Sequence, residues 1–153
     1  MTDVQVDSTA FAVTITATTE IPAPSERVWQ ILTDTASYPE WNPFVRRLEG
    51  ELSVGSRLSV DLQPNEKKPT TMKPVVVEFD AGRSFTWLGR VGLPGVLDGR
   101  HTFSVEPTAH GSRLVQHERL SGMLTPLFRA MLTIDTPAAF EASNDALAAR
   151  ALS

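Results

Sequence analysis

Apolar and polar residues alternate with a period of two along most of the first 120 residues. Apolar residues occupy every second position over 11–17, which is the pattern of a strand with one buried face, and prolines at 22 and 24 end it. Six further predicted strands lie at 44–50, 57–63, 73–80, 84–91, 99–106 and 113–120. Because their connections are short and contain turn-forming residues, we expect an antiparallel meander.

Helical periodicity appears in two regions. Residues 25–33 place apolar side chains on one face, and a short second turn at 36–38 runs into Pro39, which is expected to end it. The period is helical again after residue 122, where Pro137 is expected to kink a long helix. The apolar stripes of this helix are Leu124, Leu127, Phe128 and Met131, followed by Phe140, Asn144, Leu147 and Ala151.

This order of elements predicts an α+β fold with a cavity. We expect a curved seven-stranded antiparallel sheet wrapped around the long C-terminal helix, with two short helices between strands 1 and 2. The expectation is one domain over residues 1–153, with residues 1–9 forming a disordered tail. Strand parity is expected to gather Tyr38, Trp41, the polar loop 64–71 and the apolar, glycine-rich loop 92–97 at one rim. We expect loop 92–97 to gate that cavity.

Composition excludes several classes of protein. Apolar residues make up 41% and charged residues 21% of the 153 residues, and the net charge of −4 comes without the basic stripe of a nucleic-acid binder. There is no cysteine, and the histidines at 101, 110 and 117 lack metal-ligand spacing, so we expect neither a metal nor another cofactor. The chain has no signal-peptide pattern and no long apolar run. We therefore expect a cytoplasmic protein without stable membrane insertion, as a monomer or weak homodimer.

Several motifs resemble one superfamily. The segment Tyr38–Phe44 (YPEWNPF), which follows Pro24–Trp29 (PSERVW), is similar to the polyketide cyclase/dehydrase-like bacterial branch of the START-like, or SRPBCC, superfamily of helix-grip proteins. Further similar segments are Glu49–Gly55, Asp98–Phe103, Glu118–Gly122 and Phe140–Asn144. The resemblance covers Ala12–Leu152. It implies a helix-grip fold around an apolar cavity, and it transfers no catalytic residue.

His101 and Glu118 are the candidates for chemistry. The period of two places His101 on the inward face of its strand and Glu118 on the inward face of the next. If Glu106 faces Arg113 across the connecting loop, His101 lies directly opposite Glu118. A neighbouring carboxylate favours the protonated imidazole and burial opposes it, so the pair can exchange a proton near neutrality. The alternative is a polar pair whose members satisfy each other or a ligand.

The remaining candidates are expected to line the cavity. Trp87 either contacts ligand or packs in the core, Trp41 either contacts ligand or packs its helix on the sheet, and Asn144 bonds either into the cavity or to backbone. Arg90, Arg100, His117 and Arg119 are expected on the outer face. The predicted ligand-binding residues are Trp41, Phe44, Val60, Leu62, Val77, Phe85, Trp87, His101, Phe103, Gln116, Glu118, Leu124, Phe128, Met131 and Asn144.

Two functions are compatible with this site. We favour binding or carriage of a small hydrophobic molecule, such as a lipid, polyketide, isoprenoid or aromatic metabolite, without catalysis. The alternative is a cofactor-free cyclase or dehydratase, a lyase or isomerase in which His101 and Glu118 transfer a proton. A chaperone-like or dimerising module would need a large apolar surface patch, and no local pattern in the sequence indicates one.

Overall fold

Nine antiparallel strands form two sheets. The computed structural model describes residues 1–153. The larger sheet has the order β1-β2-β9-β8-β7-β6 and the smaller sheet the order β3-β4-β5. The strands are β1 Thr2–Ser8, β2 Ala12–Ile21, β3 Val45–Glu49, β4 Ser59–Leu62, β5 Thr70–Met72, β6 Val75–Asp80, β7 Ser84–Val91, β8 Leu97–Thr108 and β9 Gly111–Ser121. A bridge between Arg57 and Val75 joins the segment before β4 to β6 and so links the two sheets.

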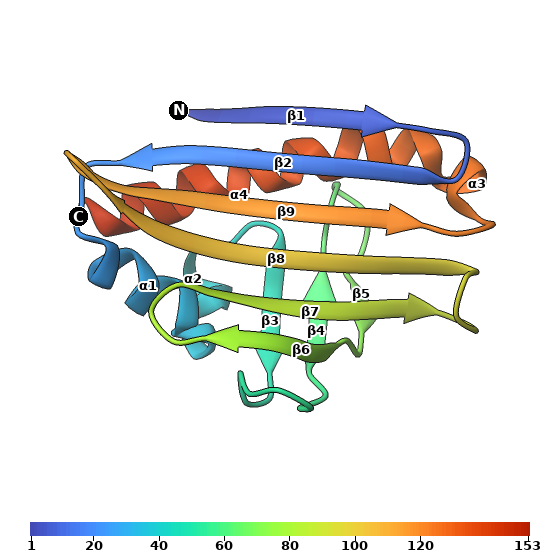
Figure 1. The fold of residues 1–153 in the computed structure, drawn as a ribbon, viewed down its shortest axis with the longest axis horizontal. Coiled ribbons are helices and arrows are strands. Elements are labelled where there is room, and N and C mark those ends of the chain that lie inside the picture. The colour runs from blue at the N-terminus through green and yellow to red at the C-terminus, as the bar shows by residue number, and fades with distance from the viewer.

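The helices lie on one side of the larger sheet. They are α1 Ser25–Thr33, the 3₁₀ turn η1 Thr35–Ser37, α2 Tyr38–Trp41, α3 Thr125–Ala130, the π-helical segment η2 Met131–Asp135 and α4 Thr136–Ala151. Figure 1 shows the large sheet in front, α4 behind β1, β2 and β9, and the small sheet behind β6–β8 with its strands crossing steeply. The core therefore lies between the large sheet and a second layer made of α4 and the small sheet. No helix combines the length and apolar character needed to cross a bilayer.

The predicted helix-grip fold is confirmed, with two strands beyond the seven predicted. The predicted disordered tail over residues 1–9 is wrong, because residues 2–8 form β1. Val4 pairs with Ala17 and Val6 with Ile15, so β1 continues the sheet along the open edge of β2. The Thr2 hydroxyl donates a hydrogen bond to Asp145 of α4 at 2.6 Å and fixes the start of the strand. The other additional strand, β5, occupies the end of the loop expected at 64–71.

Both helix-breaking prolines lie in the first turn of a helix. The prediction that Pro39 ends a helical turn is wrong, because Pro39 stands in the first turn of α2. Backbone N–H groups in a first turn have no hydrogen-bond partner within the helix, so proline costs no hydrogen bond there. Pro137 stands in the first turn of α4. The helix before it widens into η2, where the Thr136 N–H bonds to the Met131 carbonyl five residues earlier. In place of a simple kink at Pro137, the helix changes from α-helical to π-helical hydrogen bonding before the proline and returns to α-helical hydrogen bonding in α4.

The predicted rim is wrong, because its members lie at opposite ends of the molecule. β2 ends beside α1, and β9, β8 and β7 alternate in direction, so the loop after β7 lies at the end far from α1. There it contacts the chain after β9: the Met123 N–H bonds to the Gly95 carbonyl at 3.0 Å. The parity count failed because it left out β5. A meander of the seven predicted strands would make β2 parallel to β9, whereas the additional strand reverses every later direction and the two are antiparallel.

Candidate functional site

The site is built on the inner face of the three central strands. Strand register places His101 of β8 directly opposite Glu118 of β9, as predicted, with Glu106 opposite Arg113 at the far end of the hairpin. The His101 Nδ1 lies 2.9 Å from the Glu118 Oε2. Both side chains point away from the solvated face of the sheet because the period of two assigns them to the face that carries Phe103 and Val105.

The other ring nitrogen of His101 begins a chain of hydrogen bonds to α4. The His101 Nε2 is 3.0 Å from the Gln116 Oε1. The Gln116 Nε2 donates to the Asn144 Oδ1 at 2.7 Å, and the Asn144 Nδ2 donates to the backbone carbonyl of Ala17 at 3.2 Å. The sequence analysis gave two alternative partners for Asn144, and Asn144 bonds to both kinds: one interior side chain and one backbone carbonyl. The chain satisfies polar groups that would be costly to bury alone.

Aromatic rings enclose His101. The imidazole stacks on Phe103 with ring centroids 4.1 Å apart and on Phe140 of α4 with centroids 4.8 Å apart. The rings of Trp87 and His101 meet in a T-shaped arrangement with centroids 5.3 Å apart. His101 is 1% exposed and Trp87 is 4% exposed. These residues therefore pack against one another rather than around an open space. Trp87 is a core residue in this closed state.

Of the two side chains in the His101–Glu118 pair, Glu118 is the more exposed to solvent. Its side chain is 12% exposed, compared with 2% for His101. Beside it lie two glycines, Gly99 of β8 and Gly89 of β7, which are paired with each other on the inner face. The nearest atoms to them are the ends of flexible side chains: a Cβ on Gly99 would come 3.3 Å from the Leu120 Cδ2, and one on Gly89 would come 3.0 Å from the Met72 Cε. The Glu118 Oε2 and the Pro74 Cβ lie slightly farther away, each at 3.8 Å. We call Gly89 and Gly99 the glycine strip.

The other predicted residues fall into three groups. Phe44, Val60 and Phe85 are core residues, and Phe44 packs on Phe140 with centroids 5.3 Å apart. Leu62, Leu124, Phe128 and Met131 are half-buried, whereas Leu127 of the predicted stripe is 73% exposed. Leu127 faces outward because α3 turns Thr125 and Phe128, which are three residues apart and share a face, toward the sheet.

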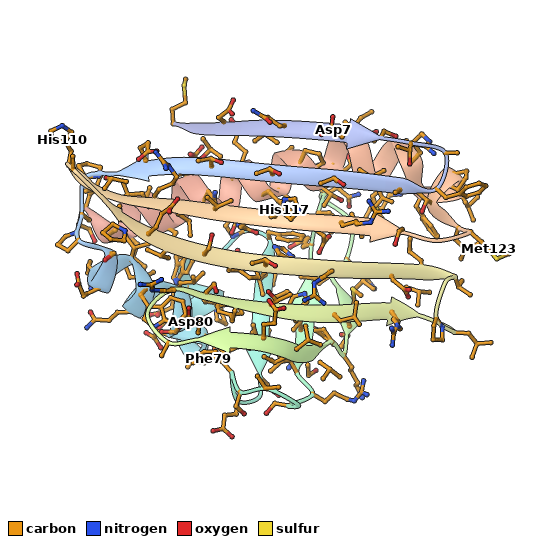
Figure 2. The ribbon with its side chains drawn as sticks, viewed as in Figure 1. Asp7, Phe79, Asp80, His110, His117 and Met123 are labelled. Carbon is orange, nitrogen blue, oxygen red and sulfur yellow. The ribbon has the colours of Figure 1, made fainter.

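Two predicted contacts lie away from the pair. Val77 is the unpaired residue of a bulge between Val76 and Glu78, and this bulge leaves Val76 in the core in its place. Trp41 packs edge-on against Tyr38 with centroids 5.3 Å apart, and its buried Nε1 has no hydrogen-bond partner. Arg90, Arg100, His117 and Arg119 are exposed, as expected, and Figure 2 shows His117 on the outer face of β9.

The two best-defined hollows are surface grooves. One, of about 590 Å³, runs between the alanine face of α4 and the loop after β4, lined by Pro43, Gln63, Pro64, Asn65, Glu66, Ala138, Ala139 and Ala142. The other is a polar groove of about 530 Å³ lined by Arg27, Gln30, Ile31, Asp34, Arg150 and Ser153. Neither contains a residue predicted to bind ligand. The expected interior cavity is therefore not among them.

Sequence reasoning missed the glycine strip and the role of Gln116 as a link. Gln116 was placed on the inward face, but its bond to Asn144 depends on how α4 crosses the sheet, and no local pattern encodes that crossing. The strip did leave a signal. Gly89 and Gly99 share the inward parity of Trp87 and His101, and a glycine inside a strand often marks close approach by a ligand or by backbone.

With this fold and site, the chain belongs to the family of polyketide cyclase / dehydrase and lipid transport proteins, whose sequence model matches residues 12–152. The family lies within the START-like (SRPBCC) superfamily. A protein of Penicillium oxalicum, "oxopyrrolidines biosynthesis cluster protein O", is 34% identical over 83 residues. That match covers 44% of this chain and 41% of the Penicillium protein, so the chain spans less than half the length of that relative.

Solved structures with the same fold include enzymes from plants and bacteria. The Zhui aromatase/cyclase from Streptomyces sp. R1128 superposes with a TM-score of 0.74 at 16% identity, covering 92% of this chain and 94% of that one. A point mutant of norcoclaurine synthase from Thalictrum flavum gives a TM-score of 0.69 at 19% identity, covering 95% and 98%. At these identities the likeness establishes the fold and not a shared activity.

Proposed function

We propose that this protein binds a small, largely apolar molecule against the inner face of β7–β9, beside Glu118 and beneath α3 and η2. The observation that carries this proposal is the position of Glu118. Its carboxylate is held by His101 inside an aromatic core, yet it remains partly accessible, next to a strip of sheet that has no side chains of its own. Membership in a family that includes lipid transport proteins supports the same conclusion.

Binding requires the closed interior to open on one side. The side chains nearest to the strip are Leu120 and Met72, both flexible and half-buried. Phe128 and Met131, also half-buried, pack on the core from α3 and η2, which are short and irregular. Displacing such side chains costs less than displacing the stacked rings around His101. Burial of apolar ligand surface then contributes roughly 25 cal/mol per Å².

A larger residue in the glycine strip tests this location. Gly99→Val fills the strip, so we expect ligand binding weakened at least about 10-fold. Because a Cβ there already comes 3.3 Å from the Leu120 Cδ2, we also expect overpacking to lower stability by about 1–3 kcal/mol. Binding of amphiphilic or aromatic compounds can be followed by tryptophan fluorescence, and stability by urea unfolding. Ser104→Val, which adds the same side chain to the outer face of β8, is the matched control. Equal affinity in both variants would place the ligand elsewhere.

Proton transfer is the second candidate function, favoured by the 2.9 Å contact between His101 and Glu118. In a cofactor-free cyclase or dehydratase, Glu118 would accept or donate a proton at the substrate, and the fold neighbours include an aromatase/cyclase. Glu118→Gln separates the two functions. Pure binding predicts a modest loss of affinity, whereas catalysis predicts nearly unchanged affinity and a turnover lowered by roughly 10²–10⁴-fold. Neither a turnover assay nor a binding assay alone distinguishes them, so both are measured on the same variant.

A further inference from the structure

We propose that Glu118, rather than His101, contacts the bound molecule, and that the site selects ligands carrying a neutral hydrogen-bond donor, such as a phenolic or enolic hydroxyl. This inference rests on the proposed function and specifies its ligand. It follows from two observations. The first is the donor and acceptor direction of each buried hydrogen bond, and the second is the identity of the atom beside His101 that has no hydrogen-bond partner in the protein.

The backbone carbonyl of Ala17 fixes the direction of every bond in the chain. A carbonyl only accepts, so the Asn144 amide nitrogen faces it and the Asn144 Oδ1 faces Gln116. Gln116 must then present its own amide nitrogen to Asn144 and its Oε1 to His101. The His101 Nε2 therefore carries a proton. The reverse orientation would bring the Asn144 oxygen against the Ala17 oxygen, two acceptors with no hydrogen between them.

The other side of His101 shares one proton with Glu118. The contact between Nδ1 and Oε2, at 2.9 Å, is favourable only if a proton lies between them, on either the imidazole or the carboxyl. In both arrangements the pair as a whole is neutral. His101 has no atom left for a ligand, because both nitrogens are bonded and both ring faces are stacked on Phe103 and Phe140. The Glu118 Oε1 makes no hydrogen bond within the protein and is the free acceptor.

A neutral hydroxyl is the ligand group that suits this acceptor best. An ammonium group would have to lose its water beside a carboxylate that His101 already neutralises, and a ligand carboxylate would repel Oε1. A hydroxyl has a small cost of desolvation and gives the unpaired acceptor its hydrogen bond. An ether of the same shape cannot donate and leaves Oε1 buried without a partner. Sites built around a hydroxyl discriminate strongly against such analogues.

Three naphthalene probes of similar size test the inference: 2-naphthol, 2-methoxynaphthalene and 2-naphthoate. Binding is measured by calorimetry and by shifts of the Gly89 and Gly99 backbone amides in NMR spectra of the intact protein. We expect 2-naphthol to bind roughly 10-fold more tightly than the methyl ether, the difference of about one buried hydrogen bond, and 2-naphthoate to bind most weakly. Glu118→Leu should abolish the preference, whereas Glu106→Leu, on the exposed end of β8, should preserve it.

The outcomes separate the inference from the proposed function. If no probe shifts the amides of the glycine strip, the proposed function fails. If all three probes bind there with equal affinity, the proposed function holds and the selection by Glu118 is overturned. The protonation of His101 gives a readout that needs no variant: its Nε2 should appear protonated in the ligand-free protein at neutral pH. An unprotonated Nε2 would contradict the direction of the whole chain. His117, exposed on the outer face, is the internal reference.

Discussion

Tyr38 is the one tyrosine of the chain, and its hydroxyl is completely enclosed. The O–H donates a hydrogen bond to the backbone carbonyl of Leu32 at the end of α1 and thereby fixes α2 to α1. Burial raises the pKa of Tyr38 well above its ordinary value of 10.0, and the nearby Asp34 carboxylate adds to the rise. The folded protein thus holds this proton more tightly than the unfolded chain does.

This difference makes stability depend on pH in the alkaline range. Because the folded pKa of Tyr38 is the higher one, its contribution is fully present below pH 10.0 and is lost as the pH rises above that value. We expect tyrosinate absorbance to appear only together with unfolding followed by circular dichroism. In Tyr38→Phe the steep alkaline loss should be absent, and the lost hydrogen bond should cost about 1–3 kcal/mol at neutral pH. Ionisation of Tyr38 at an ordinary pH in the folded protein would contradict this.

At the scale of single residues, the sequence predicted pairs within a hairpin better than contacts between layers. The His101–Glu118 contact followed from parity and one assumed pair across a short loop, and the register confirmed it. The stacking of His101 on Phe140 and the bond from Gln116 to Asn144 depend on α4, about 25 to 40 residues away in sequence. Their geometry is set by the crossing of helix and sheet, which periodicity does not describe.

The loop between β7 and β8 and the start of α3 behave structurally as one unit. The Leu124 N–H bonds to the Val96 carbonyl at 2.9 Å, next to the bond between Met123 and Gly95. Gly122 makes this approach possible, because a Cβ there would lie 2.4 Å from the Val96 carbonyl oxygen. Leu93 at the tip is 76% exposed. A movement of this loop would therefore displace α3 and, with it, Phe128, which packs against the core.

Hydrogen exchange tests whether this unit is the gate predicted from the sequence. The amides of 92–96 and 122–130 should exchange faster than those of β8 and β9 in the ligand-free protein, because few buried contacts hold them. Both segments should gain protection together when 2-naphthol or another bound probe is added. Protection equal to that of the central strands without ligand would exclude a gate. Protection of the loop alone would show that α3 does not move with it.

The elements that the sequence predicted best were those with a complete local pattern. Strand β7 and helix α1 have the predicted bounds. β1 was missed because Asp3, Gln5 and Asp7 make its pattern look like a polar tail, and its stability comes from pairing with β2. The position of the loops could not be predicted by counting strands, because β5 has only three residues and no apolar alternation, and omitting one strand reverses the direction of all later ones.

Across the whole molecule, the two ends differ in character. Exposed apolar side chains gather at the end opposite α1, where Phe11 is 59%, Met123 75% and Leu127 73% exposed. They come from two segments that are distant in sequence but joined there by the hydrogen bond from the Gly122 N–H to the Phe11 carbonyl. No local pattern in the sequence indicates such a grouping, because each segment contributes only one or two members. Figure 2 shows Met123 at this end and His110 at the other.

Both chain termini lie toward the α1 end, away from those apolar side chains. Thr2 of β1 pairs with Thr19 near the α1 end of β2, and the Arg150 carbonyl near the end of α4 accepts a hydrogen bond from Arg27 of α1. A fusion partner, affinity tag or surface linker attached at either terminus would therefore leave the end with loop 92–96 facing the solution. For immobilised biosensors, either attachment point presents the same end of the molecule, so the choice between them can be made for convenience.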